Sequence, residues 1–242
     1  QLSRLVARVL PCVAKETTRY AISGVLFRRD KKTFECVATD GRRLAITKAE
    51  IEAAEKPCSA IIPGRVLNLL PQCSAPEGAL VRVKIAESRV YFAFEDADGK
   101  DLGVAVSSVL VEGAFPPYEG IVPKDYKRRA KVLAGDLHRT LRQASVLTNE
   151  ESRGVRFAFG DGSLKLTSRA PEMGESDIET PLAAYEGSPL EISFNPSFVV
   201  DAVRNSAADA EVAIELNDSN KPGTFRVGGD FMCVIMPVNL PA

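Results

Sequence analysis

The sequence predicts an α+β protein of two duplicated domains, each with two helices packed on antiparallel sheets. Three observations lead to this fold class: the chain length, the alternation of apolar and polar residues over short segments, and the recurrence of one order of elements. At 242 residues the chain is long for one ordinary domain and sufficient for two, each able to bury a core. No apolar run approaches the roughly 18 residues that a bilayer-spanning helix needs, so we expect no membrane segment.

The first half of the chain contains amphipathic and alternating segments in a clear order. An amphipathic helix is predicted at about residues 2–14, because apolar residues recur there at helical spacing. The remaining predicted elements are strands at 20–28 and 33–39, a helix within IIPGRVLNLL at 61–70, and strands at 81–85 and 90–94.

The second half repeats this order. A helix is predicted at about 135–147, followed by strands at 154–159 and 163–168, a helix within 194–203, and a strand at 211–216. Matching residues of the two halves lie 130, 133 and 131 positions apart: Gly24 with Gly154, Pro63 with Pro196, and Val81 with Val212. This nearly constant offset indicates a duplicated domain. Periodicity alone leaves open any other pair of α+β domains.

The stretch from Val122 to Asp136 resembles an inter-domain connector, because Pro, Gly and five basic residues stand between two regularly patterned regions. We therefore place the boundary near Pro123, with domains at 1–123 and 124–242. The basic residues of this stretch are expected to be solvated on the outside: Lys124, Lys127, Arg128, Arg129 and Lys131.

Composition disfavours catalysis, metal binding and disulfides. The five cysteines, Cys12, Cys36, Cys58, Cys73 and Cys233, include no CxxC pair, which fits a reducing cytoplasm and argues against zinc or a disulfide framework. His138 is the only histidine. Acid/base catalysis by carboxylates such as Asp40 or Glu150 is the enzymatic alternative, but no motif ties a second carboxylate to either. We expect a non-enzyme without cofactor or metal.

The charge balance limits the kind of nucleic-acid contact. The net charge is −1, which excludes a generally basic protein that neutralises many phosphates. The halves carry +2 (17 basic, 15 acidic residues, 1–123) and −3 (14 basic, 17 acidic residues, 124–242). A locally basic face remains compatible with these values.

Five segments in order resemble the beta subunit of bacterial DNA polymerase III, the sliding clamp family. They are ATDGRRLA at 38–45, EGAFPPYEGIVP at 112–123, LTNEESRGVRF at 147–157, EGSPLEISFNPSFVVDAV at 186–203, and VIMPVNL at 234–240. The resemblance implies the DNA-clamp fold and covers the family's middle and C-terminal domains, whereas the N-terminal clamp domain is absent from this chain. We expect truncation, because the chain begins at a helix without a start methionine.

The resemblance also implies a function. Family members are rings of head-to-tail homodimers in the cytoplasm, which encircle double-stranded DNA without reading its sequence. They tether the replicative polymerase catalytic subunit, the clamp loader, other polymerases and repair proteins through short peptides that dock between the second and third domains. The alternative is a clamp-derived scaffold that binds proteins and does not encircle DNA.

Site residues follow from the matching motifs. The implied peptide-binding residues are Ile22, Thr39, Gly41, Arg42, Arg43, Leu44, Pro116, Ile121, Asn195, Phe198, Val234, Ile235, Met236, Pro237, Val238 and Leu240. The candidate DNA-facing residues on the helices are Arg4, Arg8, Arg65, Arg139, Arg142 and Arg204. Val146 and Leu147 resemble the edge that packs against a neighbouring subunit.

The sequence departs from the family at the rim of this site. Gly120 and Asn239 stand where the family often has Arg, Phe198 where it often has Tyr, and Ser152 where some members have an aromatic residue. These changes leave the preference for particular partners open. For individual arginines and for Val234, Ile235 and Leu44, an ordinary solvated face or a core strand is the alternative interpretation.

Overall fold

The structure is a computed structural model that describes residues 1–15, 21–52, 56–73, 78–147, 154–160, 162–170 and 174–239. The chain folds into two compact units. The first comprises Gln1–Gly41 and Ile46–Pro117, and the second comprises Arg42–Ala45 and Tyr118–Ala242. The domain boundary predicted near Pro123 remains a prediction.

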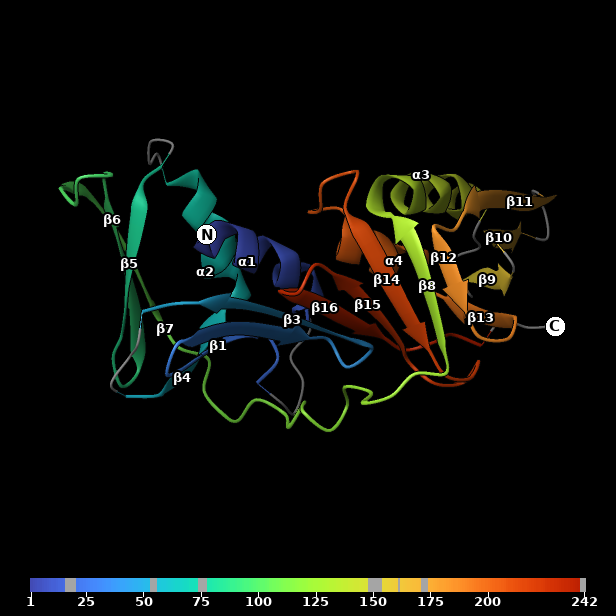
Figure 1. The fold of residues 1–242 in the computed structure, drawn as a ribbon. Helices are drawn as coiled ribbons and strands as arrows, with labels where there is room; N and C mark the ends of the chain where they lie inside the picture. The colour runs from blue at the N-terminus through green and yellow to red at the C-terminus, as the bar shows by residue number, and fades with distance from the viewer. Residues whose placement is uncertain are drawn as a thin grey trace. The chain divides into compact units, whose positions relative to one another are not determined.

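Among its described residues, the first unit contains two helices with short 3-10 extensions and seven strands, of which β3 begins in the Arg42–Ala45 segment of the second unit (Figure 1). In chain order these are α1 (Leu2–Val9), η1 (Leu10–Cys12), β1 (Gly24–Asp30), β2 (Thr33–Thr39), β3 (Arg43–Glu50), β4 (Cys58–Pro63), α2 (Gly64–Leu69), η2 (Leu70–Gln72), β5 (Leu80–Ile85), β6 (Arg89–Glu95) and β7 (Asp101–Val109). The strands form neighbours in the order β3-β2-β1-β4 and, separately, β5-β6-β7, so that β5 and β7 are outer strands.

The core of the first unit lies between the helices and the strands. α1 buries Leu5, Val6 and Val9 on one face, as its apolar spacing predicts. Gly24 begins β1 opposite Pro63 of β4, and a Cβ there would stand 2.5 Å from the Ile62 carbonyl oxygen. Glycine is therefore needed for this close strand pairing.

The second unit contains the remaining described strands and the helices α3 and α4. In chain order these are β8 (Arg128–Leu133), α3 (Ala134–Ala144), η3 (Ser145–Leu147), β9 (Val155–Gly160), β10 (Ser163–Ala170), β11 (Gly174–Pro181), β12 (Ala184–Glu186), β13 (Leu190–Phe194), α4 (Pro196–Val203), β14 (Glu211–Leu216), β15 (Gly223–Val227) and β16 (Phe231–Ile235). Antiparallel neighbours run in the orders β12-β8-β14-β15-β16 and β11-β10-β9-β13.

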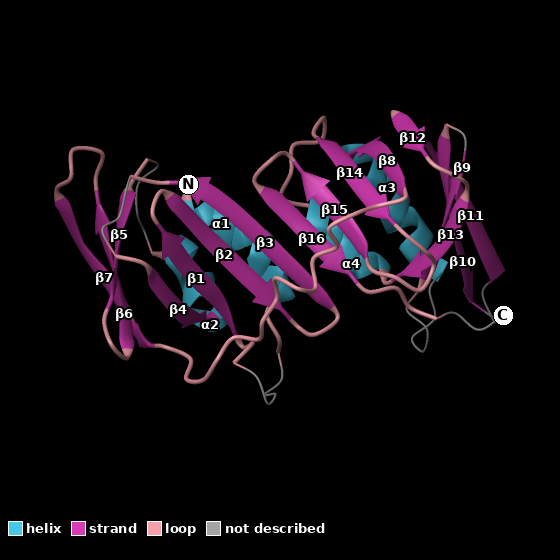
Figure 2. Ribbon diagram, turned by 60° about the horizontal axis from the view of Figure 1, so that its bottom comes forward, coloured by secondary structure: helices cyan, strands magenta, loops and turns pink. Residues whose placement is uncertain are grey.

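Aromatic rings from three strands fill the core of the second unit. The Phe194 ring meets Phe157 and Phe225 edge to face, with ring centres 5.3 and 5.6 Å apart. α3 buries Leu137 and Leu141 completely and packs against α4. In each unit the helices lie on one side of the strands (Figure 2), which confirms the α+β class with helices packed on antiparallel sheets.

Three predicted elements differ in the structure: the first helix ends at Val9 and continues as the 3-10 turn η1, the first strand is Gly24–Asp30, and the connector is partly a strand. The stretch expected to be a solvated connector contains the strand β8, which pairs with β14 and β12. Its basic side chains pair with acidic residues, as in Lys131 Nζ to Glu211 Oε1 at 2.9 Å, and the Arg128 side chain is only 15% exposed. These ion pairs allow basic residues to stand in a strand. The run of basic residues therefore led the sequence analysis to predict a connector where β8 lies.

Candidate functional site

The predicted peptide-binding residues of the second unit gather around Arg43. The side chain of Arg43, at the start of β3, is 8% exposed, and its Nη1 lies 2.8 Å from Asp201 Oδ2 on α4. Its Cζ lies 4.3 Å from the centre of the Phe198 ring, which is within cation–π distance. The other oxygen of Asp201 accepts Arg204 Nη1 at 3.1 Å. We call Arg43, Phe198, Asp201 and Arg204 the Arg43 cluster.

The sequence Asn195-Pro196-Ser197-Phe198 sets the start of α4. The Asn195 side chain caps the helix, since its Oδ1 accepts the Ser197 N–H at 3.0 Å. Pro196 occupies the first helical position, where no hydrogen-bonding N–H is required. The cap therefore fixes the half-buried Phe198 ring in the first turn.

The C-terminal segment runs beside these residues. The Met236 N–H donates to the Arg42 carbonyl at 3.0 Å, and the Val238 N–H donates to the Ser193 carbonyl at 2.9 Å. The side chains of Val234 and Ile235 are buried in β16, whereas Met236 is 44% exposed. Met236 is thus an accessible apolar side chain on a backbone held at two points. Pro237 and Val238 are half-buried.

The other predicted peptide-binding residues have varied positions. In the first unit, Ile22 is buried, Pro116 is half-buried, and Thr39 Oγ1 accepts the N–H of Gly41, whose φ of 86° favours glycine. In the second unit, Leu44 is buried and Ile121 is 50% exposed. Leu240 and Ser152 lie outside the described residues.

All six candidate DNA-facing arginines lie on helices or at a helix end. Arg4 and Arg8 belong to α1, Arg65 to α2, Arg139 and Arg142 to α3, and Arg204 caps α4. Arg139 pairs with Asp136 at 2.7 Å, and Arg204 pairs with Asp201. The structure therefore places the six side chains on helices, and two of them are partly neutralised by carboxylates.

The two residues expected at a subunit edge end the helical segment of α3. Val146 is 69% exposed, and Leu147 closes the 3-10 turn η3. The exposed, branched apolar side chain of Val146 is compatible with packing against a neighbouring subunit. That contact remains a proposal.

Several ionisable groups have shifted pKa values. Burial raises the pKa of the Cys36 thiol far above its ordinary value, and the neighbouring Glu35 adds to this effect. On β10 and β11, a hydrogen bond from Lys165 lowers the pKa of Asp177, and the same bond raises the pKa of Lys165. All five cysteines are free thiols.

Among the described residues, no group of three or more His, Cys, Asp or Glu side chains is arranged to hold a metal ion. None of the helices in this part of the chain is long and apolar enough to cross a membrane.

Sequence reasoning missed Asp201, which contacts Arg43 directly. The signal was its position three residues after Phe198 on a predicted helix, because residues three apart share a helix face. Motif matching pointed to Asn195 and Phe198 in this segment.

Solved structures with the same fold define the class of this protein. A crystal structure of the DNA polymerase III subunit beta from Pseudomonas aeruginosa matches with a TM-score of 0.88 and 27% identity, over 99% of this chain and 64% of that chain. The sliding clamp of Bacillus subtilis matches with a TM-score of 0.87 and 26% identity, over 99% and 62%. A third structure, the P. aeruginosa clamp bound to griselimycin, matches with a TM-score of 0.87 and 26% identity over 99% of this chain and 63% of that one. The chain therefore has the sliding clamp fold.

Family models and curated relatives identify the family. Residues 1–117 match the central domain of the DNA polymerase III beta subunit, and residues 119–239 match its C-terminal domain. The chain is 30% identical to the beta sliding clamp of Vibrio cholerae over 248 aligned positions, covering 99% of this chain and 64% of that protein. It is 31% identical to the clamp of Escherichia coli K12 over 219 positions, covering 90% and 57%. The chain belongs to the DNA polymerase III beta subunit family, which consists of non-catalytic processivity factors.

Proposed function

We propose that this chain supplies the partner-docking part of a DNA sliding clamp. The observation that carries the proposal is the match of two consecutive clamp domains over residues 1–117 and 119–239. Met236, Arg43 and Phe198 belong to the second compact unit, in which the C-terminal segment runs beside Arg42 and the capped start of α4.

The proposed ligand is an extended peptide that carries a Gln and two or three large apolar side chains. Met236 suits varied apolar anchors, because its thioether side chain is unbranched and adaptable. The buried Val234 and Ile235 support it from β16, while Asn195 and Arg43 hold the neighbouring helix. Such a mixture of apolar contact and a few fixed polar groups is typical of sites shared by several partners. The remaining peptide-binding residues named from the sequence belong to the same proposal.

The chain spans about 64% of the length of the V. cholerae and P. aeruginosa relatives. Encirclement of DNA, a head-to-tail homodimeric ring, and contacts with polymerases and the clamp loader are therefore part of the proposal. The helix arginines provide the positive side chains that a sliding ring needs near duplex DNA, without base readout.

Peptide binding to the Met236→Ala variant tests the docking site. Met236 is 44% exposed, so its truncation leaves the core intact and removes only the ligand contact. We expect a fluorescein-labelled peptide, Gln followed by apolar residues, to bind the parent saturably and the variant about tenfold more weakly, as for a contact worth roughly 1.4 kcal/mol. Fluorescence anisotropy measures both affinities.

The matched control is Leu133→Ala in the same unit, because Leu133 is a similarly exposed apolar residue on β8, at 42%. It should bind like the parent. Equal loss in both variants, or failure of the folded parent to bind, would contradict the proposed docking site.

The second candidate function is a clamp-derived scaffold that binds proteins without encircling DNA. The net charge of −1, and the pairing of Arg139 and Arg204 with carboxylates, favour this alternative. A protein of this kind has the same docking site for peptides but does not encircle DNA.

A further inference from the structure

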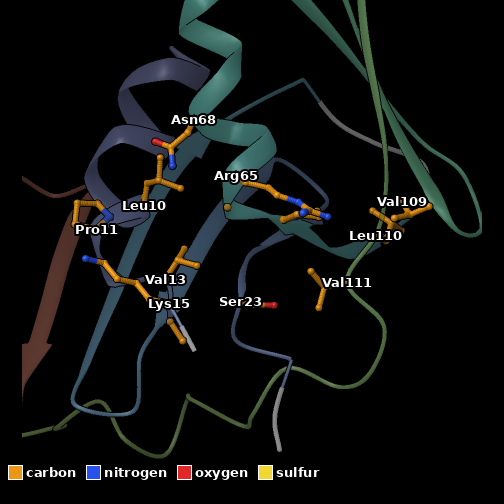
Figure 3. A pocket seen from close by; sticks show the side chains of 13 residues that line it. Leu10, Pro11, Val13, Lys15, Ser23, Arg65, Asn68, Val109, Leu110 and Val111 are labelled. Atoms are coloured by element: carbon orange, nitrogen blue, oxygen red, sulfur yellow. The ribbon is translucent and has the colours of Figure 1, made fainter. Parts of the chain in front are cut away.

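The first unit contains a pocket of about 580 Å³ that the proposed function does not use. It lies between the end of α1 with its 3-10 extension, the start of α2, and the segment that leaves β7 (Figure 3). Its apolar lining includes Leu10 and Val13 on one side and Val109 to Val111 on the other. Every lining residue belongs to the first unit.

Two cationic side chains border this pocket. Figure 3 shows Arg65 extending from α2 toward Val109 and Leu110, with Lys15 near Pro11 in the same view. Both side chains are exposed, and neither forms an ion pair with any residue in the described part of the chain. The pocket therefore combines an apolar lining with two positive charges that form no ion pair with the described residues.

The same backbone arrangement occurs at the Arg43 cluster of the second unit. The Val111 N–H donates to the Ile61 carbonyl at 2.9 Å, two residues before the N-cap of α2. The Val238 N–H donates to the Ser193 carbonyl at 2.9 Å, two residues before the N-cap of α4. In both units the segment after the last strand thus binds beside the start of the second helix.

The accessible side chains also correspond. Val109 stands two residues before its hydrogen-bonded valine and is 53% exposed, as Met236 stands two residues before Val238 and is 44% exposed. Arg65 lies in the first turn of α2, as Phe198 lies in the first turn of α4. The duplicated fold therefore places the segment after the last strand beside the start of the second helix in both units, and Arg65 adds a cation there in the first unit.

We propose that the pocket of the first unit binds an extended peptide whose aliphatic side chains are flanked by acidic ones. The aliphatic side chains would pack against Val13, Val109 and Val111, and the carboxylates would pair with Arg65 and Lys15. This partner differs from that of the proposed function, because the Arg43 guanidinium is already paired with Asp201. Charge complementarity at exposed groups sets partner choice more than affinity, so the acidic flanks supply the specificity.

Anisotropy with a labelled Gly-Asp-Leu-Val-Asp-Gly peptide tests this proposal on the whole chain. We expect saturable binding, and a loss of about tenfold in the Lys15→Glu, Arg65→Glu double variant, since two attractive charges become repulsive. The uncharged peptide Gly-Asn-Leu-Val-Asn-Gly should bind about as weakly to the parent. Val109→Asp should also weaken binding, by removing an exposed apolar contact.

Two controls separate this pocket from the docking site of the second unit. Lys84→Glu makes one such charge reversal on the exposed strand β5 and should leave binding unchanged. Met236→Ala should leave it unchanged as well. The proposal is overturned if the acidic peptide does not bind saturably, if the uncharged peptide binds equally, or if Met236→Ala abolishes binding while the double variant retains it.

Discussion

Arg43 shows how one residue connects sequence motif, packing and site. Its guanidinium is mostly removed from water, and a charge in that position requires a partner. Asp201 supplies the opposite charge, and the Phe198 ring covers the guanidinium plane. The arginine therefore fixes the position of α4 relative to the start of β3, and with it the surface beside Met236.

Replacing Asp201 by Asn tests this role. We expect the variant to lose about 2 kcal/mol of unfolding free energy, because the Arg43 charge keeps its low exposure and loses its carboxylate. Urea unfolding followed by circular dichroism measures the change.

Arg204→Ala is the comparison, since it removes the more exposed partner of the same carboxylate and should cost below about 1 kcal/mol. An Asp201→Asn protein as stable as the parent would show that the pair contributes no net stability.

At the scale of elements, several periodic segments were predicted, whereas the strands β3, β4, β7 and the charged β8 were not. β2 has the predicted bounds, Thr33–Thr39, because a short run rich in strand-forming residues is flanked by turn residues on both sides. α4 lies within its predicted range and begins at the predicted proline. β8 was hidden because its basic residues are compensated by acidic partners from other parts of the sequence, such as Glu211 and Glu215.

One of the two candidate sites could be predicted from the sequence, and the other could not. The motif residues Asn195, Phe198 and Met236 were found because each stands in a recognisable segment. The pocket of the first unit was missed because Val13, Arg65 and Val109 come from three distant segments, each of them ordinary in isolation. Only the fold brings them to one place.

Helix α3 offers a test of which face is buried. Leu137 is fully buried, whereas Arg142 is exposed on the same helix. Leu137→Ala should destabilise the protein by about 3 kcal/mol through lost burial and the cavity left behind. Arg142→Ala should change stability by below about 0.5 kcal/mol.

Thermal or urea unfolding compares these two variants of α3. A small effect of Leu137→Ala would mean that α3 turns another face to the core, and the assignment of Arg139 and Arg142 as DNA-facing would then lose its basis.

For the whole molecule, the property that separates a sliding clamp from a scaffold is encirclement of DNA. We expect a chain that also carries the family's remaining domain to stay on closed circular DNA after loading and to leave when that DNA is linearised. A protein held by encirclement has no exit from a circle, whereas one held by phosphate contacts leaves both forms at a rate set by salt. Gel filtration of the loaded DNA before and after restriction cleavage measures retention.

Substitution of the helix arginines tests their role in the same experiment. Arg4→Glu combined with Arg142→Glu should lower the amount loaded, and the difference from the parent should shrink at higher salt, where charges are screened. Equal loss of protein from intact and cut circles would instead support the scaffold alternative, in which peptide binding persists without encirclement.

The outer strand β5 of the first unit has a consequence for handling the protein. Leu80 and Val83 are 52% and 36% exposed on a strand that has a neighbour on one side only in the described sheet. Such an edge offers backbone groups to other chains, and Lys84 opposes stacking by repulsion between copies, whereas Arg82 is paired with Glu95. Salt screens that repulsion while leaving the apolar side chains attractive. Concentrated solutions of this chain therefore stay dispersed best in buffers of low ionic strength.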